Sequence, residues 1–273
     1  MADRAKELGA DMIFGMGGGK ALDTAKGAAD RAGLPVFTFP TIAATCAATT
    51  ALSVVYREDG NFDSFYFYDK PARHCFINTR VIADAPGSIC GPAWEIRWVN
   101  FLSVTSRPEE TGWITALPGQ GDQPTCVMAP SLEHGVQALA DCKRHEPSFA
   151  LQQAVLANIV STGMVSLMVL DDYNCAIAHS VYYGLVLLPG FEEKYLHGDV
   201  VAYGVLVQLA VDQDRERLGE AKKFLEKLGI PSTLKEMGVP LDREYLAAVL
   251  RETVTGPDME HIPYPVTEDM IFE

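Results

Sequence analysis

The sequence predicts an α/β part that is followed by an all-helical part. Residues 1–86 alternate short apolar runs with helical segments and glycine or proline turns, which is the pattern of a parallel sheet with crossover helices. From Leu132 onward, apolar residues recur every three to four positions, as they do in amphipathic helices. A chain of 273 residues has room for one or two domains. We therefore expect two domains with a cleft between them.

The N-terminal part contains signals for a short parallel sheet and a β-hairpin. After a short helix, the apolar run Asp11–Phe14 predicts a strand that ends in the glycine-rich residues 15–19. A helix from Lys20 to Arg31 follows, with Gly33 as its stop signal. Further strands are expected at Pro35–Pro40, at Ala51–Arg57 and Asn61–Tyr68 around the turn Glu58-Asp59-Gly60, and at Phe76–Ile77.

The C-terminal part is predicted to be helical throughout. Its helical segments share an apolar spacing that would bury one face of each helix in a common core. They are Leu132–Cys142, Phe149–Leu170, Cys175–Leu188, Val200–Arg215, Arg217–Leu228 and Arg243–Glu252.

Residues 89–131 fit neither part. This segment holds all three tryptophans and five of the 16 prolines, but no lysine and no sustained periodicity. A structureless stretch of roughly 40 residues is unusual inside a compact chain. We therefore divide the chain into an α/β domain over 1–88, an anomalous segment over 89–131 and a helical domain over 132–273.

Composition limits the possible function classes. Acidic residues outnumber basic ones by 36 to 22, which gives a net charge of −14, and the sequence has no basic stripe for nucleic acid. It has neither an apolar run of the roughly 18 to 20 residues that a membrane span needs nor a secretory signal. The six cysteines are scattered without a C-x-x-C pair, which is typical of reduced thiols in the cytosol. We expect a cytoplasmic protein without nucleic-acid or membrane partners.

The glycine-rich turn GMGGGK, residues 15–20, stands between a predicted strand and a predicted helix. Glycines let the backbone approach a ligand closely, and a helix N-terminus presents free N–H groups, so the turn favours a bound phosphate. The spacing is not G-x-G-x-x-G. It is not a P-loop either, because Phe14 stands where the first glycine should be and Ala21 replaces the Ser or Thr. A tight turn without a ligand is the alternative.

A second candidate segment, PTIAATCAA at residues 40–48, follows the second predicted strand. It should lie at the carboxyl edge of the sheet, where open α/β sheets bind their ligands. Its small residues and threonine hydroxyls suit a nucleotide or a small polar substrate. An ordinary threonine-capped turn is the alternative.

Together with two later motifs, these segments resemble a known family. GMGGGKALDTAK, PTIAATCAATTALSVVY, AHSVYYGL and LHGDVVAYGVLVQ are similar, in order and spacing, to the metal-dependent alcohol dehydrogenases of the glycerol dehydrogenase type. The resemblance covers most of 1–88 and 132–273. It implies the iron-alcohol dehydrogenase, or dehydroquinate synthase-like, architecture: an incomplete Rossmann-like NAD-binding sheet and a helical metal- and substrate-binding domain. It also implies NAD and Zn²⁺ or Fe²⁺ as cofactors and, in the intact family member, a homo-oligomer.

The resemblance assigns residues to the NAD site and to the substrate pocket. Glycerol dehydrogenases hold their substrate with an aspartate where this chain has Cys46. The T-C-A-A version is more similar to the branch that acts on 2-oxo or 2-hydroxy acids, for which an anionic side chain would be a poor pocket wall. The positions carried over to NAD are Gly17, Gly18, Gly19, Lys20 and Asp23 at the pyrophosphate, Thr41 and Ala44 along the nucleotide, and Thr50, Leu52 and Tyr56 near the nicotinamide.

The family binds its metal with one aspartate and two histidines. His179 and His197 match the two histidines, and imidazole is a common ligand of zinc and iron. Without the resemblance, a histidine such as His179 on a helix is more often a core residue. A further family histidine is replaced here by Tyr182, which weakens any argument for a proton relay.

The metal aspartate of the family belongs to a G-[MI]-G-D-[TA] motif that this chain lacks. The motif should fall near residues 88–98. The segment CGPAWEIRWVNF at 90–101 can be encoded so that another reading frame gives RAGMGDTVGKFF. We therefore interpret 89–131 as a frame-shifted copy of the aspartate-bearing segment, with a lineage-specific insertion as the alternative. The chain also begins just before the glycine-rich turn, without the strand that contacts the adenine ribose, so we expect a fragment.

The resemblance implies an NAD-dependent oxidoreductase that interconverts a small secondary alcohol, a glycerol-like polyol or a 2-hydroxy acid, and its ketone by metal-assisted hydride transfer. A catalytically impaired fragment is the alternative. Such a fragment lacks the metal aspartate and part of the nucleotide domain, and it would bind metal weakly. A third hypothesis is another member of the fold, a dehydroquinate synthase or a glycerol-1-phosphate dehydrogenase, and the T-C-A-A segment argues against it.

Overall fold

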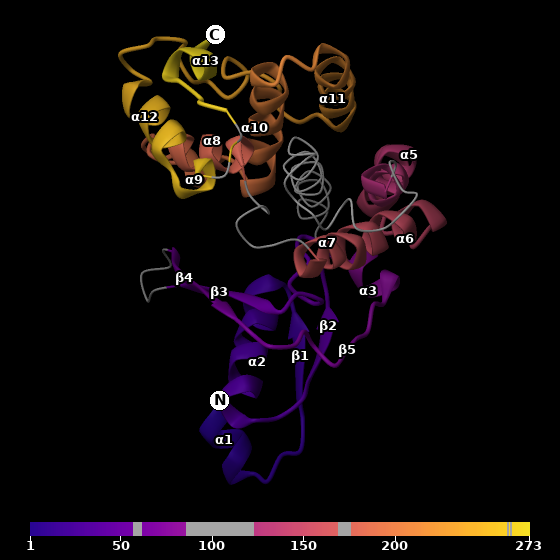
Figure 1. Ribbon diagram of the computed structural model, residues 1–273. Coiled ribbons are helices and arrows are strands. Elements are labelled where there is room, and N and C mark those ends of the chain that lie inside the picture. The colour runs from indigo at the N-terminus through magenta and orange to yellow at the C-terminus, as the bar shows by residue number, and fades with distance from the viewer. Residues whose placement is uncertain (57–61, 86–122, 169–175, 261, 263) are drawn as a thin grey trace. The chain divides into compact units, whose positions relative to one another are not determined.

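The computed structural model describes residues 1–56, 62–85, 123–168, 176–260, 262 and 264–273, and the chain divides into two compact units (Figure 1). Of these residues, unit 1 contains 1–56, 62–85 and 137–168, and unit 2 contains the remainder. The helical residues 137–168 therefore belong to the same compact unit as the sheet, although they come later in the sequence.

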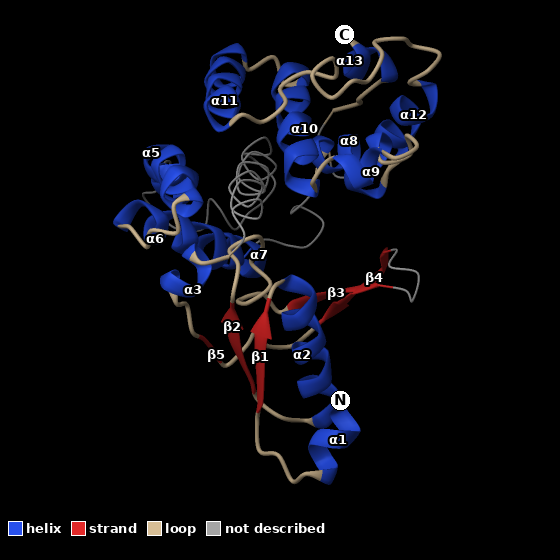
Figure 2. Cartoon of the chain, turned by 180° about the vertical axis from the view of Figure 1, so that it is seen from behind, coloured by secondary structure: helices blue, strands red, loops and turns tan. Residues whose placement is uncertain are grey.

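Unit 1 is built on a parallel sheet. β1 (Ile13–Gly17) pairs with β2 (Val36–Pro40), and β2 pairs with β5 (His74–Cys75). After the short helix α1 (Ala2–Glu7), α2 (Gly19–Ala32) packs against β1, as Figure 2 shows. The two come close because residue 15 is glycine, where a Cβ would lie 2.6 Å from the Cβ of Ala25. The predicted order of strand, glycine-rich turn, helix and strand is confirmed.

The predicted hairpin is also present in unit 1. β3 (Leu52–Tyr56) and β4 (Phe62–Phe67) are antiparallel, with a shift of register between Val55 and Tyr56. The predicted turn at residues 58–60 lies outside the described residues. β3 packs against α2 and so connects the hairpin to the helix that follows the glycine-rich turn.

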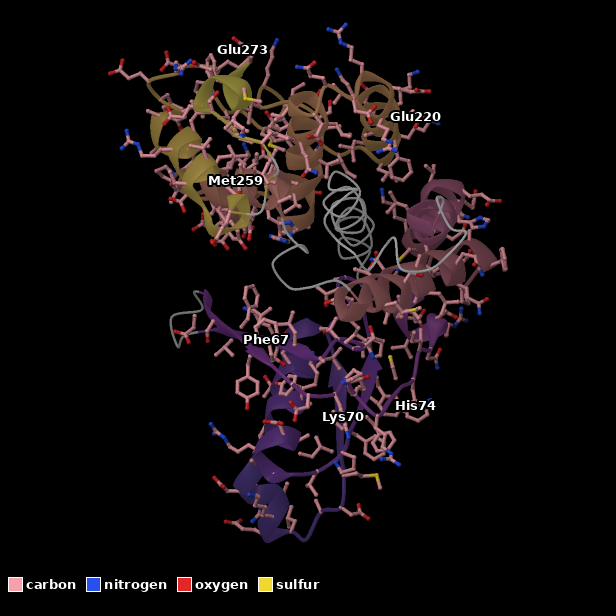
Figure 3. All side chains as sticks on the ribbon, viewed as in Figure 1. Phe67, Lys70, His74, Glu220, Met259 and Glu273 are labelled. Carbon is pink, nitrogen blue, oxygen red and sulfur yellow. The ribbon has the colours of Figure 1, made fainter. Side chains whose placement is uncertain are left out.

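Aromatic side chains gather on the sheet, and we call Phe14, Phe37, Phe39 and Phe76 the aromatic face. The ring centroids of Phe14 and Phe37 are 5.2 Å apart, and those of Phe39 and Phe76 are 4.6 Å apart. His74, labelled in Figure 3, lies beside Phe76 with its ring centroid 4.4 Å away. Gly15 faces α2, so the preceding residue of β1, Phe14, points to the other side of the sheet. The side chain of Phe14 is 56% exposed.

Unit 1 also contains helices that follow the sheet in the sequence. α3 (Thr79–Ala83) is capped by the side chain of Asn78. The last turns of α5 (Gln123–Lys143) precede α6 (Phe149–Leu156) and α7 (Thr162–Met168). The prediction of one continuous helix over Phe149–Leu170 is wrong in one respect: α6 and α7 are joined by a π-helical turn, Ala157–Ser161. One wider turn hardly changes the apolar spacing, so the sequence pattern does not reveal it.

The described residues of unit 2 form helices, as predicted for the C-terminal part, but residues 137–168 of the predicted helical domain 132–273 are grouped with unit 1. The larger helices of unit 2 are α8 (Ile177–Leu185), α10 (His197–Val211), α11 (Arg215–Leu228) and α12 (Ala247–Thr255). α8 packs against both α10 and α12, and two glycines allow the close approach: Gly204 contacts the backbone of Ala178, and Gly184 contacts that of Val249. Shorter elements that the sequence analysis omitted are α9 (Phe191–Lys194), a 3₁₀ turn (Pro257–Met259) and α13 (Glu268–Phe272).

The cysteines differ from the sequence-based expectation. Cys46 and Cys75 are free thiols, but Cys142 is disulfide-bonded. The expectation of reduced thiols is therefore wrong for Cys142, because wide spacing along a sequence does not prevent two thiols from meeting in the fold. Of the helices in the described residues, none is long and apolar enough to cross a membrane.

Candidate functional site

The glycine-rich turn leaves the N-terminus of α2 open. Gly18 is the N-cap residue and offers no capping side chain, and Gly17 has a φ of +145°, which favours glycine. A Cβ on Gly17 would lie 2.7 Å from the Cβ of Ala21, and one on Gly18 would lie 2.9 Å from Cδ1 of Ile42. The turn thus has no space for side chains, and no side chain at Gly18 caps the helix, a geometry that favours a bound anion. A pyrophosphate fits this cradle.

The loop of residues 41–50, named here the 41–50 loop, lies beside the glycine-rich turn. The backbone N–H of Thr41 donates to the carbonyl of Gly17 at 3.1 Å. The Oγ1 atom of Thr45 lies 3.2 Å from where a Cβ on Gly19 would be. Of the residues carried over to the nucleotide, Thr41 and Ala44 are half-buried in this loop, and Lys20 is exposed on the first turn of α2. The structure therefore brings the two predicted phosphate-side segments together.

Asp23 is placed differently from the other candidates for the pyrophosphate. Its carboxylate accepts a hydrogen bond from the backbone N–H of Val54 at 3.3 Å, and its Oδ1 lies 3.0 Å from Nζ of Lys26. Both of these partners belong to the contact between α2 and β3. Asp23 thus attaches the hairpin to the helix.

Lys26 is a buried residue that the sequence analysis did not single out. Its Nζ donates to the carbonyl of Leu52 and lies 3.4 Å from Oγ1 of Thr50. Lys26 therefore contacts two of the residues assigned to the nicotinamide end. Burial lowers the pKa of Lys26, while Asp23 acts in the opposite direction. The signal was available in the sequence, because Lys26 follows Asp23 by three positions in GGGKALDTAK and so shares its helix face. The side chain of Tyr56 lies outside the described residues.

Cys46, the candidate for the substrate pocket, lies in the middle of the 41–50 loop. It is half-buried, and its Cβ is 3.8 Å from where a Cβ on Gly163 of α7 would lie. Burial raises the pKa of the Cys46 thiol to about 11, with a small opposing effect of Lys26. At neutral pH this position is therefore uncharged, unlike an aspartate.

The two predicted metal histidines meet in unit 2. His179 comes from α8 and His197 is the first residue of α10, and their ring centroids are 5.9 Å apart. His179 is 7% exposed, and its Nδ1 has no hydrogen-bond partner among the described residues. The ring of Tyr182 packs edge-on against His197, with 4.3 Å between the ring centroids. A buried, unpartnered ring nitrogen beside a second imidazole is the arrangement that a metal ion would complete.

The protonation state of this histidine pair also fits a metal. Burial, with a smaller effect of the neighbouring His197, lowers the pKa of His179 to about 3. The side chain of His197 is partly open to solvent, and desolvation by the residues packed around its ring lowers its pKa as well. Both imidazoles are therefore neutral at pH 7, which is the form that coordinates metals. Within the described residues no third His, Cys, Asp or Glu joins the pair. The segment expected to carry the family aspartate, residues 88–98, lies outside them.

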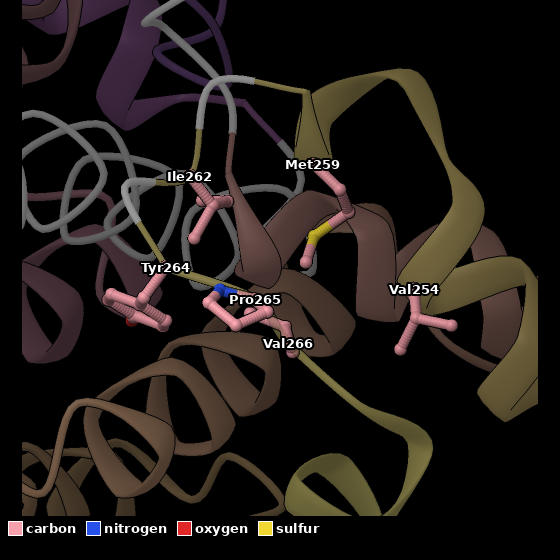
Figure 4. A pocket seen from close by; sticks show the side chains of 6 residues that line it. All are labelled: Val254, Met259, Ile262, Tyr264, Pro265 and Val266. Atoms are coloured by element: carbon pink, nitrogen blue, oxygen red, sulfur yellow. The ribbon is translucent and has the colours of Figure 1, made fainter.

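A separate depression in unit 2 has an apolar lining. It encloses about 360 Å³ and is lined by Val254, Met259, Ile262, Tyr264, Pro265 and Val266 (Figure 4). The hydroxyl of Tyr264 donates to Oδ1 of Asp212. The lining includes neither His179 nor His197, so we do not assign the reaction to this depression.

Comparison with known proteins gives the family. The model of the family described as iron-containing alcohol dehydrogenase matches residues 1–74. A glycerol dehydrogenase from Thermotoga maritima is 31% identical over an alignment of 270 positions, which covers 96% of this chain and 72% of that protein. The chain belongs to the iron-containing alcohol dehydrogenase family. Hydroxycarboxylate dehydrogenase A of Escherichia coli is 32% identical to this alcohol dehydrogenase family member over an alignment of 274 positions, which covers 98% of the chain and 75% of the relative.

The fold of this alcohol dehydrogenase family member agrees with its relatives. The crystal structure of glycerol dehydrogenase from Schizosaccharomyces pombe is 26% identical, with a TM-score of 0.79 over 99% of this chain and 70% of that chain. The predicted family and fold class are therefore confirmed. The chain is a member of a family of metal-dependent dehydrogenases, and the comparisons give no support to a non-catalytic fragment.

Proposed function

We propose that the chain interconverts a small secondary alcohol and its ketone, with NAD as the hydride carrier and Zn²⁺ or Fe²⁺ held by His179 and His197. The observation that carries this proposal is the buried Nδ1 of His179, which lacks a partner and lies beside a second neutral imidazole. The uncapped N-terminus of α2 supports the nucleotide part.

The nucleotide half of the proposal rests on unit 1. The N–H groups at residues 19–21 bind the pyrophosphate of NAD, and the small residues 17–19 let the backbone approach it. Thr41 and Ala44 of the 41–50 loop line the nucleotide, and the loop's Thr50 and the nearby Leu52 and Tyr56 lie toward the nicotinamide. NAD held by these residues would supply the hydride acceptor for the reaction.

The metal half of the proposal rests on unit 2. A dication held at the pair supplies Lewis acidity and a counter-charge for the substrate oxygen as its proton leaves. His179 and His197 bind as neutral ligands, and the packing of Tyr182 fixes the ring of His197. Because His179 is buried, its unpartnered ring nitrogen has little access to water, which favours a metal ion as its partner.

Cys46 favours a 2-hydroxy acid, or its 2-oxo product, over a neutral polyol. A neutral thiol with a pKa of about 11 does not repel a carboxylate, whereas an aspartate would. A thiol is also a weaker hydrogen-bond acceptor for polyol hydroxyls than a carboxylate is. The polyol remains the second candidate, since one of the relatives quoted above is a glycerol dehydrogenase.

The test is steady-state kinetics of the metal-loaded chain with NAD and 2-hydroxybutyrate, glycerol or 1,2-propanediol. The expected result is the highest kcat/KM for the hydroxy acid. In Cys46→Asp, kcat/KM for the hydroxy acid should fall more than tenfold and that for glycerol should rise, while Cys46→Ser, the matched uncharged control, should keep the order of the wild type. Turnover without any effect of Cys46→Asp would contradict the substrate assignment, and bound NADH and metal without turnover would contradict the proposed reaction.

A further inference from the structure

The 41–50 loop is attached at two points to the π-helical turn Ala157–Ser161. The side-chain amide of Asn158 donates to the carbonyl of Ala43 at 2.6 Å, across 115 residues of sequence. The hydroxyl of Thr49 donates to the carbonyl of Ile159 at 2.6 Å, across 110 residues. These bonds hold the two ends of the segment 43–49, in the middle of which Cys46 lies.

The bond between Asn158 and Ala43 is buried, and the bond between Thr49 and Ile159 is partly buried. Asn158 is 4% exposed and Ala43 is 7% exposed, so water cannot replace a lost partner at this contact without entering the interior. The Oγ1 atom of Thr49 is also 3.1 Å from the carbonyl of Cys46, but a hydroxyl has one proton, and the shorter distance to Ile159 identifies that carbonyl as its acceptor. Gly163, at the start of α7, makes room for Thr49, since any Cβ there would overlap the Thr49 hydroxyl.

The π-helical turn gives this attachment its geometry. Such turns are rare and occur frequently at functional sites, because they displace side chains and carbonyls from the regular positions of an α-helix. Here the displaced turn directs an amide and a carbonyl at the loop whose other side contacts the glycine-rich turn through Thr41. The helix, the loop and the glycine-rich turn thus form one continuous series of contacts.

We propose that Asn158 is a positioning residue for the nucleotide: with Thr49, it fixes the 41–50 loop in the conformation that lines NAD. This inference rests on the proposed function for the ligand, while the attachment itself is a property of the free protein. Asn158 acts through the loop and is not assigned any contact with NAD or substrate.

The experiment compares Asn158→Ala and Thr49→Val with two matched controls. Thr49→Ser keeps the hydroxyl. Thr162→Val removes a buried hydroxyl from the same part of the helix, where Thr162 bonds only to the carbonyl of Ala157 in the described structure. Amide hydrogen exchange of residues 41–50 is measured without nucleotide, and NADH affinity is measured by fluorescence titration.

Asn158→Ala and Thr49→Val should speed exchange in the 41–50 loop at least tenfold and raise the Kd for NADH at least tenfold. Thr49→Ser and Thr162→Val should change each quantity less than threefold, even where the thermal midpoint falls. If hydrogen exchange of the loop is unchanged in Thr49→Val, the proposal that these bonds hold the loop is wrong. Thr49→Val provides this test even if Asn158→Ala does not fold. Faster exchange with an unchanged Kd for NADH would overturn the positioning role. A wild-type chain that does not bind NADH at all would instead overturn the proposed function.

Discussion

Nζ of Lys26 lies 3.0 Å from Oδ1 of Asp23, one helical turn earlier on α2, and the two side chains are only 2% and 11% exposed. The pair is located where α2 meets β3, since Lys26 also donates to the carbonyl of Leu52 and Asp23 accepts from the N–H of Val54. The buried ion pair of Lys26 and Asp23 therefore connects α2 to the hairpin. If the Lys26–Asp23 pair moved, Thr50 and Leu52, which are hydrogen-bonded to Lys26, would move with it and change the proposed contacts with the nicotinamide end of NAD.

Replacing Lys26 with methionine should destabilise unit 1 strongly. The substitution keeps the length of the side chain but leaves Asp23 as a buried carboxylate without its cation, a loss of roughly 3 to 5 kcal/mol. Urea unfolding measures the change. The double variant Asp23→Asn, Lys26→Met should recover a large part of the loss, because no charge is then buried alone. Equal stability of the single variant and the wild type would show that the pair is not coupled to folding.

Replacing Gly17 with alanine should weaken both folding and nucleotide binding. A φ of +145° strains an alanine, and its Cβ would also overlap Ala21. Gly33 is the matched control, because it has a φ of +71° but no atom within 4 Å of a Cβ. Gly33→Ala should lose about 1 kcal/mol of stability and keep the wild-type affinity for NADH. If both variants bind NADH equally well, the cradle assigned to the glycine-rich turn is wrong.

Replacing His179 with alanine should remove the metal. A two-histidine pair that loses one imidazole keeps a single neutral ligand, which holds a dication weakly. Metal content after dialysis, measured by plasma emission, should fall to below one tenth of the wild-type value. His74→Ala is the control, since His74 is an exposed histidine of the other unit and should keep the wild-type content. Retention of the full metal content in His179→Ala would refute the assignment.

The reactivity of Cys46 should report its raised pKa. Only the thiolate is alkylated, and with a pKa of about 11 the thiolate fraction at pH 8 is about one in a thousand. Alkylation by iodoacetamide should therefore accelerate about tenfold per pH unit from pH 8 to pH 10 and level off near pH 11. Since the folded pKa lies above that of the unfolded chain, Cys46 should also reduce stability as the pH rises from about 8.5 toward 11. Peptide mass spectrometry follows the alkylation, and a plateau near pH 9, as in the unfolded control, would contradict the burial of this thiol.

Much of the fold could be predicted because the patterns involved are local. The apolar run before Gly15, the glycines themselves and the stop at Gly33 predict a strand, a turn and a helix within residues 11–33, and all three are present. The histidine pair could be assigned because the motifs around His179 and His197 resemble a family, and the fold brings the two rings together. Their ligand role stays a prediction.

The contacts that organise the candidate site could not be predicted in the same way. An asparagine inside an apolar helix, such as Asn158, gives no sequence signal for its partner 115 residues earlier. Asp23 was assigned to the pyrophosphate from its place in the motif, but its hydrogen bond to Val54 depends on where the hairpin packs. Tertiary pairing of this kind depends on the assembled fold and not on local spacing.

The aromatic face should make the solubility of the chain depend on salt concentration. Phe14 and Phe76 present apolar rings to water, and the net charge of −14 keeps separate molecules apart by repulsion at low ionic strength. Added salt screens that repulsion within a few ångströms, and sulfate in addition strengthens the attraction between exposed rings. The purified chain should thus be most soluble in dilute buffer and should precipitate early in an ammonium sulfate series, and polar substitutions at Phe14 should delay the precipitation.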